Sequence, residues 1–305
     1  MFLGTRGSEL ALKQAQEVLD QLQAARPQVR FQIRTVTTSG DARPNDPIDK
    51  LGIGAFVKEL EVALQRREID VAIHSLKDVP VSQPVGMTIA AVTRRDDPRD
   101  VLVNRWELPL DELPKGARIG TGSPRRAAQL LNLRPDIEVL PIRGSVVTRL
   151  EKSRGKDYDG VVVALAGLRR LGRQEEVAQV FAPEVFVPAP GQGALGLEIR
   201  EEDEELAAVV RTIQDPDTAA SVQAERALLM RLGGGCRAPF GAYASIAGEV
   251  LTLTAVLAEE TGTRIYKVTA AGRVQDPEAI ANEAHRQLMD MGVTTTPPLP
   301  GGGGK

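Results

Sequence analysis

The same pattern of strand, turn and helix occurs twice in this sequence, near its start and again from residue 118. Residues 3–8 (LGTRGS) and 118–123 (RIGTGS) each lead from a short apolar run into a turn of small residues, and a serine follows that can cap a helix. Pro124 fits the first position of the second helix. Strands that alternate with helices build parallel sheets with right-handed crossovers, so the pattern predicts two α/β units.

The elements around these turns follow the same scheme. Hydrophobic periodicity predicts helices over 8–25 and 58–67, and strands over 29–36, 70–74, 137–142 and 159–167, the last two each followed by a helix. Residues 37–55 form a loop rich in Gly, Asp and Pro. It is too long for an ordinary connection, which predicts a lid or a disordered segment.

Two segments are suited to join the units, namely 94–100 (RRDDPRD) and 188–193 (PAPGQG). Two crossings between two α/β units predict a hinged pair with a cleft between them. From residue 215 the pattern changes to a helix, strands and a last helix near 277–290, which predicts a small α+β domain. We therefore expect domain 1 at 1–95 and 191–213, domain 2 at 96–190, domain 3 at 214–293 and a disordered tail at 294–305.

Composition excludes several classes of protein. No run of about 18 uncharged apolar residues is present, so a membrane-spanning helix is not expected. The first ten residues lack the basic and apolar regions of a secretory signal, which predicts a cytoplasmic protein. Cys236 is the only cysteine, and His74 and His285 are the only histidines. An intramolecular disulfide and a metal centre built on these residues are therefore not expected.

Positive charge is concentrated in one part of the chain. The whole sequence carries a net charge of −3, yet residues 115–173 hold 13 basic and 5 acidic side chains. A general preference for arginine over lysine does not explain that clustering. Guanidinium groups bind carboxylates and phosphates in bidentate fashion. Because only 3% of the residues are aromatic, base stacking has few candidates, and an acidic small ligand is favoured over nucleic acid.

The two helix starts are candidate anion sites, because free backbone N–H groups and a partial positive charge meet there. At the first, simple capping by Ser8 is sufficient. The second adds Arg125 and Arg126 in the first helical turn, where their charge opposes the helix dipole. Some other group should compensate that cost, which favours a functional interpretation of the second turn.

Lys77 and Asp78 follow an apolar predicted strand, at the place where open α/β sheets bind ligands. The pair could hold an anionic group and a developing cation side by side, or it is a solvated loop. Cys236 follows three glycines, which let a ligand approach the backbone, and precedes Arg237, which favours the thiolate. Its alternatives are a small buried hydrophobe or a hydrolase nucleophile with His74 as base.

Four further arginines are spaced along the second unit: Arg143 directly follows a predicted strand, Arg149 lies on the helix expected after it, and Arg169 and Arg170 lie in the segment LAGLRRLG. Each alone is most simply a surface charge. Together with the paired arginines of the second helix start they could surround a polyanion.

All these segments occur together in one known family. The chain resembles the porphobilinogen deaminase (hydroxymethylbilane synthase) family almost end to end, in the motifs TRGSELAL, FVKELEVAL, HSLKDVP, DDPRDVLV, GTGSPRRAAQL, IRGSVVTRL, ALAGLRRLG, PAPGQGALGLE and GGGC. The resemblance implies two periplasmic-binding-protein-like (type II) α/β domains with a hinge, plus a small C-terminal α+β domain. It implies a monomer that condenses four porphobilinogen molecules head to tail into hydroxymethylbilane, with release of ammonia.

The resemblance also implies the site. A dipyrromethane cofactor would be joined by a thioether to Cys236, and Asp78 matches the catalytic aspartate. The cofactor-binding positions are matched by Lys77, Thr121, Ser123, Arg125, Arg126, Gly167 and Gln192. The positions that bind substrate or chain carboxylates are matched by Arg6, Ser8, Lys50, Arg143, Arg149 and Arg170. No metal is implied.

Three positions depart from the family pattern. Ile53 stands where many members carry a basic residue, Gly122 replaces a serine, and Pro190 replaces a small apolar residue. The main alternative function is that of a non-catalytic, hinged two-domain protein that binds a small anion. The expected absence of an export signal and the thiol loop in a third domain argue against it.

Overall fold

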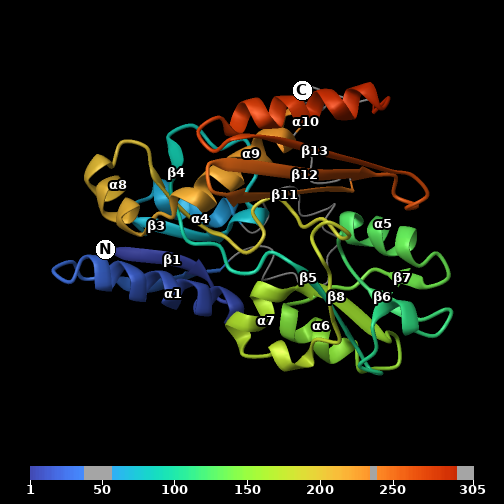
Figure 1. Ribbon diagram of the computed structural model, residues 1–305. Helices are drawn as coiled ribbons and strands as arrows, with labels where there is room; N and C mark the ends of the chain where they lie inside the picture. The colour runs from blue at the N-terminus through green and yellow to red at the C-terminus, as the bar shows by residue number, and fades with distance from the viewer. Residues whose placement is uncertain (38–56, 234–238, 294–305) are drawn as a thin grey trace, which may run out of the picture.

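The computed structural model describes residues 1–37, 57–233 and 239–293, and it contains three sheets with helices packed against them (Figure 1). Sheet 1 has the order β2-β1-β3-β10-β4. Its strands are β1 (Phe2–Arg6), β2 (Gln32–Val36), β3 (Val71–Ser75), β4 (Met87–Val92) and β10 (Leu195–Arg200). The helices of this unit are α1 (Glu9–Ala25), α4 (Lys58–Gln65) and α8 (Glu204–Val210).

Sheet 2 has the order β7-β6-β8-β5-β9. Its strands are β5 (Asp100–Asn104), β6 (Arg118–Gly120), β7 (Glu138–Leu140), β8 (Gly160–Ala164) and β9 (Gln179–Val180). The helices of this unit are α5 (Pro124–Leu133), α6 (Val146–Lys152) and α7 (Leu165–Leu171). Each sheet is lined by a buried apolar core of its own.

The two sheets have the same topology, and the repeated sequence pattern predicted the two α/β units to which they belong. The repeated turn follows β1 in sheet 1 and β6 in sheet 2, and each of these strands is parallel to both of its neighbours. The fourth strand in each order, β10 or β5, arrives from the other unit and runs antiparallel. The chain thus passes twice between the two units, and each passage ends in a strand of the unit that it enters. We call residues 93–99 and 181–194 the crossing segments.

Most predicted elements form where the periodicity placed them, with one correction. The predicted strand over 159–167 was wrong at its end, because β8 stops at Ala164 and α7 begins at Leu165. A short apolar run suits a buried strand or a buried helix equally well, and periodicity alone cannot separate them. The loop predicted at 37–55 lies outside the described residues after Thr37, and so does the predicted disordered tail at 294–305.

The third unit is a small α+β domain, as expected. Sheet 3 consists of the antiparallel strands β11 (Phe240–Ala247), β12 (Val250–Ala258) and β13 (Ile265–Arg273). Helices α9 (Pro216–Arg231) and α10 (Pro277–Asp290) pack against it around a separate apolar core (Figure 1). Among the described residues, no helix is long and apolar enough to cross a membrane. The exact domain boundaries proposed from the sequence stay a prediction.

One side chain of α9 ties both crossing segments to the third domain. The carboxylate of Glu225, which is fully buried, accepts two hydrogen bonds from the guanidinium of Arg95, at 2.7 and 3.0 Å. It also accepts the backbone N–H groups of Gly191 and Ala244, each at 2.7 Å. Arg95 lies in the first crossing segment, Gly191 in the second and Ala244 on β11, so one acid joins all three units.

The crossing segments pack so closely that one position requires glycine. Gly193 has a φ of +91°, and a Cβ there would lie 2.4 Å from the carbonyl oxygen of Asp96. The Asp96 N–H donates to the Gly193 carbonyl at 3.3 Å, so the two segments are also hydrogen-bonded. A side chain at this position meets both backbone strain and a clash that a rigid backbone atom cannot relieve.

We predict that Gly193→Ala lowers the free energy of unfolding by about 3 kcal/mol. The matched control is Gly86→Ala, because Gly86 has a φ of +82° and nothing within 4 Å of an added Cβ. The control variant has the backbone strain without the clash, so its free energy of unfolding should fall by only about 1 kcal/mol. Denaturant unfolding of both variants checks the difference, and equal losses would contradict the close packing of the crossings.

Candidate functional site

The segment after β3 is a single helical turn, Leu76–Asp78, and it is held from two directions. The Leu76 N–H donates to the carbonyl of Ala194 in the second crossing segment, at 3.0 Å. From α9, the guanidinium of Arg226 donates to the carbonyls of Val79 and Pro80, at 2.8 and 2.7 Å. The backbone that presents Lys77 and Asp78 is therefore anchored by the third domain and by a crossing segment.

Asp78 lies at the end of this turn and its side chain is exposed. Its carboxylate makes no hydrogen bond to any residue that the structure describes. Lys77 is only partly exposed, and its ammonium donates to Oε1 of Gln192 at 3.2 Å. Burial, followed by the positive charge of Arg126, lowers the pKa of Lys77 to about 8, while Asp78 and Asp100 oppose this shift.

The paired arginines begin α5, where Ser123 caps the helix by accepting the Arg126 N–H at 3.5 Å. Both guanidinium groups are buried on one carboxylate, that of Asp100 at the start of β5. Arg125 donates to Oδ2 of Asp100 at 2.7 Å, and Arg126 donates to Oδ1 from Nε and Nη2 at 3.0 and 2.7 Å. The compensating group that the sequence required is thus an acid of the first strand of sheet 2.

Arg149 on α6 faces the same space. Its Nε donates to the Gly144 carbonyl at 2.9 Å, and its terminal amino groups have no partner among the described residues. Burial and the positive charges of Arg126 and Arg143 lower the pKa of Arg149 to about 10, while the negative charge of Asp78 opposes this shift. The charge of Asp78, an acid of the first unit, thus acts on a cation of the second unit.

This cluster holds more cations than anions. Its described cationic members are Lys77, Arg125, Arg126, Arg143 and Arg149, and its acids are Asp78 and Asp100. Burial and mutual repulsion both disfavour these positive charges. Their clustering therefore indicates a site for an anionic ligand, which would supply the missing negative charge.

Other predicted site residues shape the turns near the cluster. Ser8 caps α1 by accepting the Ala11 N–H at 3.3 Å, and Thr121 accepts the Ser123 N–H at 3.2 Å. Arg6 ends β1 and is half-buried. Gly167 packs between α1 and α6, since a Cβ there would lie 3.7 Å from Leu10 and 3.8 Å from Val146. Cys236 and Lys50 lie outside the described residues.

Gln192 and Arg170 make contacts that their predicted roles do not include. Gln192 is buried and bonded to protein groups through both its amide atoms. Arg170 donates to Glu17 on α1 at 2.8 Å and to the Gly193 carbonyl at 3.2 Å. Arg170 makes no hydrogen bond or ion pair to Lys77 or Asp78, and its role as a carboxylate ligand stays a prediction.

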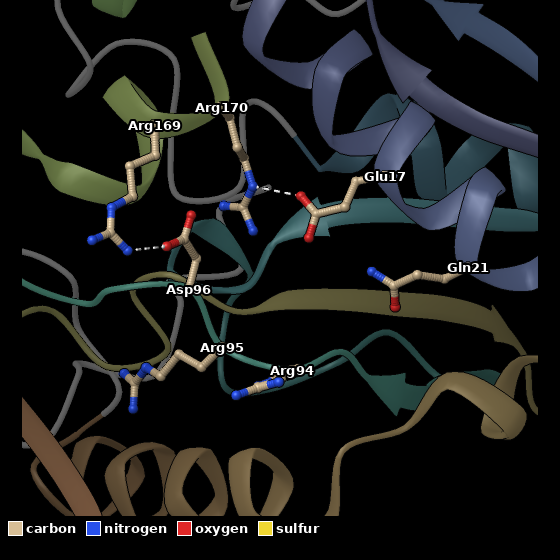
Figure 2. Close-up of a pocket in the computed structure, with 7 residues that line it drawn as sticks. All are labelled: Glu17, Gln21, Arg94, Arg95, Asp96, Arg169 and Arg170. Atoms are coloured by element: carbon tan, nitrogen blue, oxygen red, sulfur yellow. Dashed lines mark hydrogen bonds and ion pairs between the residues drawn. The ribbon is translucent and has the colours of Figure 1, made fainter. Parts of the chain in front are cut away.

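Arg170 lines a separate hollow of about 390 Å³ beside the crossing segments (Figure 2). Figure 2 shows Arg170 directed at Glu17 and Arg169 directed at Asp96, and the two ion pairs measure 2.8 and 3.1 Å. The full lining is Glu17, Gln21, Arg94, Arg95, Asp96, Arg169 and Arg170. This hollow is distinct from the cluster around Lys77, and its ion pairs hold α7 to α1 and to the first crossing segment.

Three residues that organise the site were missed in the sequence, namely Asp100, Glu225 and Arg226. The paired arginines signalled that an acid was needed, but the DDPRD segment offers three aspartates and the pattern does not select one. Glu225 and Arg226 lie in α9, far from the site along the chain, and nothing in SVQAERALLM separates them from ordinary helical surface charges.

Comparison with known proteins agrees with the resemblance. Residues 1–208 match the family model "Porphobilinogen deaminase, dipyromethane cofactor binding domain", and residues 219–290 match "Porphobilinogen deaminase, C-terminal domain". The porphobilinogen deaminase of Syntrophus aciditrophicus is 45% identical over 293 residues, which cover 96% of each chain. That of Desulforudis audaxviator is 46% identical over 291 residues, which cover 95% of this chain and 94% of the relative.

Among solved structures, the methionine-binding protein MetQ shares 12% sequence identity, with 70% of this chain and 87% of MetQ covered and a TM-score of 0.43. The matches to both family models and to relatives along nearly the whole length show that the chain belongs to the porphobilinogen deaminase family.

Proposed function

We propose that this protein joins four porphobilinogen molecules head to tail on a dipyrromethane cofactor with loss of four ammonia molecules, that hydrolysis then releases hydroxymethylbilane from the cofactor, and that Asp78 is the catalytic residue. The observation that carries the assignment of the site is the cluster in which an exposed carboxylate, Asp78, lies within the field of Lys77 and Arg149. The activity is inferred from membership of the porphobilinogen deaminase family. The non-catalytic anion-binding alternative is not favoured, because the match includes the C-terminal domain.

The residues present fit a cofactor that carries carboxylates. Lys77 and Arg149 keep N–H groups that no described residue accepts, and Arg126 adds a nearby positive charge. We propose that Lys77 and Arg126 hold the cofactor carboxylates, with Ser123 fixing the helix start from which Arg126 projects, and that Arg149 is left to bind the substrate. The covalent attachment is assigned to Cys236 on the family motif. When bound, the cofactor supplies the pyrrole carbon to which the first substrate is joined.

Asp78 acts on the substrate as its amine departs. Loss of ammonia leaves positive charge on the substrate's methylene carbon, shared with the pyrrole nitrogen. A carboxylate that accepts a hydrogen bond from the pyrrole N–H stabilises that charge, because it is held in place before the charge develops. Asp78 also takes the proton that the attacking ring carbon loses after the new bond has formed.

The arginines bind the substrate's acid groups. The charges of Asp78 on the first unit and of Arg143 on the second both act on Arg149, so a substrate held between the units would meet cations on one side and the acid on the other. Such a placement orients the reacting carbon toward Asp78. Binding of the acid groups thereby holds the reacting groups in the geometry that the reaction needs. Arg6, Ser8, Lys50 and Arg170 are proposed as further carboxylate ligands on the family pattern.

We propose a cytoplasmic monomer without a nucleic-acid partner. The net charge of −3 and the low aromatic content support the exclusion of nucleic acid.

Asp78→Asn should keep the fold and the covalent cofactor but lower the rate of product formation by about 100-fold or more. The amide keeps the shape of the side chain and loses its negative charge. Steady-state assays of hydroxymethylbilane formation check this. Asp111→Asn is the matched control, because Asp111 is also an exposed aspartate in a single helical turn and lies in no described site. A wild-type rate in the Asp78 variant would remove Asp78 from its role.

Cys236→Ala should abolish attachment of the cofactor. Intact mass spectrometry of the purified wild-type protein should show an adduct of two linked pyrroles, and the alanine variant should have the mass of the bare polypeptide. An adduct that persists in the variant would place the anchor at another residue.

The reaction should slow at alkaline pH because the site loses a cation. The pKa of Lys77 is lowered to about 8, so its ammonium is charged below that pH and becomes neutral above it. Carboxylate binding at Lys77 should therefore weaken as the pH rises through 8, while the arginines keep their charge. A pH profile of the rate should fall with a midpoint near 8 in the wild type, and Lys77→Arg should move that fall to higher pH. An unchanged profile in the arginine variant would exclude Lys77 as its origin.

A further inference from the structure

One buried carboxylate organises the cationic side of the site. Asp100 is fully buried, and its two oxygens accept hydrogen bonds from three side chains. These are Arg125 at 2.7 Å, Arg126 at 3.0 and 2.7 Å, and Nε2 of Gln192 at 2.9 Å. The sequence pattern did not single out this residue.

Gln192 extends the arrangement across the boundary between the first two units. Its Nε2 donates to Asp100 and to the Pro98 carbonyl at 2.6 Å. Its Oε1 accepts from Lys77 at 3.2 Å and from Arg126 at 3.4 Å. An amide has two donors and two acceptor positions, and all four are used on protein groups. Gln192 is therefore occupied in aligning other side chains.

The charge balance depends on the same acid. Arg125 and Arg126 lie at a helix start, where the dipole disfavours positive charge, and both are buried. Two buried guanidinium groups need a buried counter-charge, and Asp100 is the only acid with which either makes an ion pair among the described residues. The remaining excess of positive charge, on Lys77 and one guanidinium, is what the site offers to a ligand.

We propose that Asp100 and Gln192 are positioning residues for the cofactor-binding cations: Asp100 aligns the Arg125 and Arg126 guanidinium groups and the Gln192 amide, and that amide aligns the Lys77 ammonium across the domain boundary. The inference rests on the proposed function for the identity of the ligand. Its geometric part, the link from Asp100 through Gln192 to Lys77, involves this chain's own groups alone.

The link has a direct consequence for the titration of Lys77. The charged groups that face its ammonium are Arg126, Asp78, Asp100 and Arg125. Asp78 and Asp100 favour the charged form, and the two arginines disfavour it. Asp100→Asn removes one favourable charge and leaves both unfavourable charges without a counter-ion. The pKa of Lys77 should then fall below about 8, its wild-type value.

The test compares Asp100→Asn with the wild type in the full-length, cofactor-bearing protein. The rate of Lys77 modification by acetic anhydride is measured against pH, with the modified peptide quantified by mass spectrometry. We expect the midpoint to move down by roughly one pH unit. Intact mass should show a several-fold smaller fraction of protein with the two-pyrrole adduct, because the cations are no longer aligned. Neither readout needs turnover.

Asp159→Asn is the matched control. Asp159 is another poorly exposed acid of the second unit that is paired with an arginine, Arg118, but it precedes β8 at the opposite end of the sheet from the α5 start. We expect a loss of stability there without a change in Lys77 titration or cofactor loading. A purely structural role of Asp100 would make the two variants alike, and that result would overturn the proposal.

A second variant covers the case in which Asp100→Asn does not fold. Gln192→Met keeps the side-chain length and removes the amide, so Lys77 loses its acceptor and its midpoint should again fall. Unchanged titration and loading in this variant would overturn the proposal. If the wild type carries no adduct and makes no tetrapyrrole while the midpoints shift as expected, the proposed function fails and the positioning role stands.

Discussion

The ion pair between Glu225 and Arg95 is the contact on which the arrangement of the three units depends. It is buried, bidentate and supplemented by two backbone N–H donors from the second crossing segment and from sheet 3. A buried ion pair is modest evidence for stability, but removal of one partner leaves an uncompensated charge and costs about 3–5 kcal/mol. The next residue of α9, Arg226, anchors the loop that carries Asp78. The small third domain thus holds both the crossing segments and the loop that carries Asp78.

The site itself is built from side chains that neither of the first two units could assemble alone. Lys77 and Asp78 come from the first unit, and Arg126 and Arg149 come from the second. They meet because the crossing segments pack backbone against backbone, with Gly193 at the point of closest approach. Gln192, one residue earlier, bridges the two sets of cations. The same segment therefore connects the units and completes the site.

Much of the fold could be predicted from local pattern. Ser8 and Ser123 cap the helices that follow the repeated turns, as their positions indicated, and the last helix spans 277–290 as expected. The error at 159–167 arose because the apolar residues of VVVALAG satisfy a strand and a helix alike. The antiparallel strands β5 and β10 were not predicted, since their direction depends on which unit they leave and which they enter.

The sequence by itself determined the local elements, the excess of cations in the second unit and the Lys77–Asp78 turn at a strand end, because these depend on residues that are near neighbours in the chain. It also showed that the charges of Arg125 and Arg126 needed a compensating negative charge. Tertiary structure alone decided that Asp100 supplies this charge. It also decided that Glu225 pairs with Arg95 in a crossing segment and that Arg226 anchors the loop after β3. The choice among many acids and bases is made by distance and burial, which only the packed chain defines.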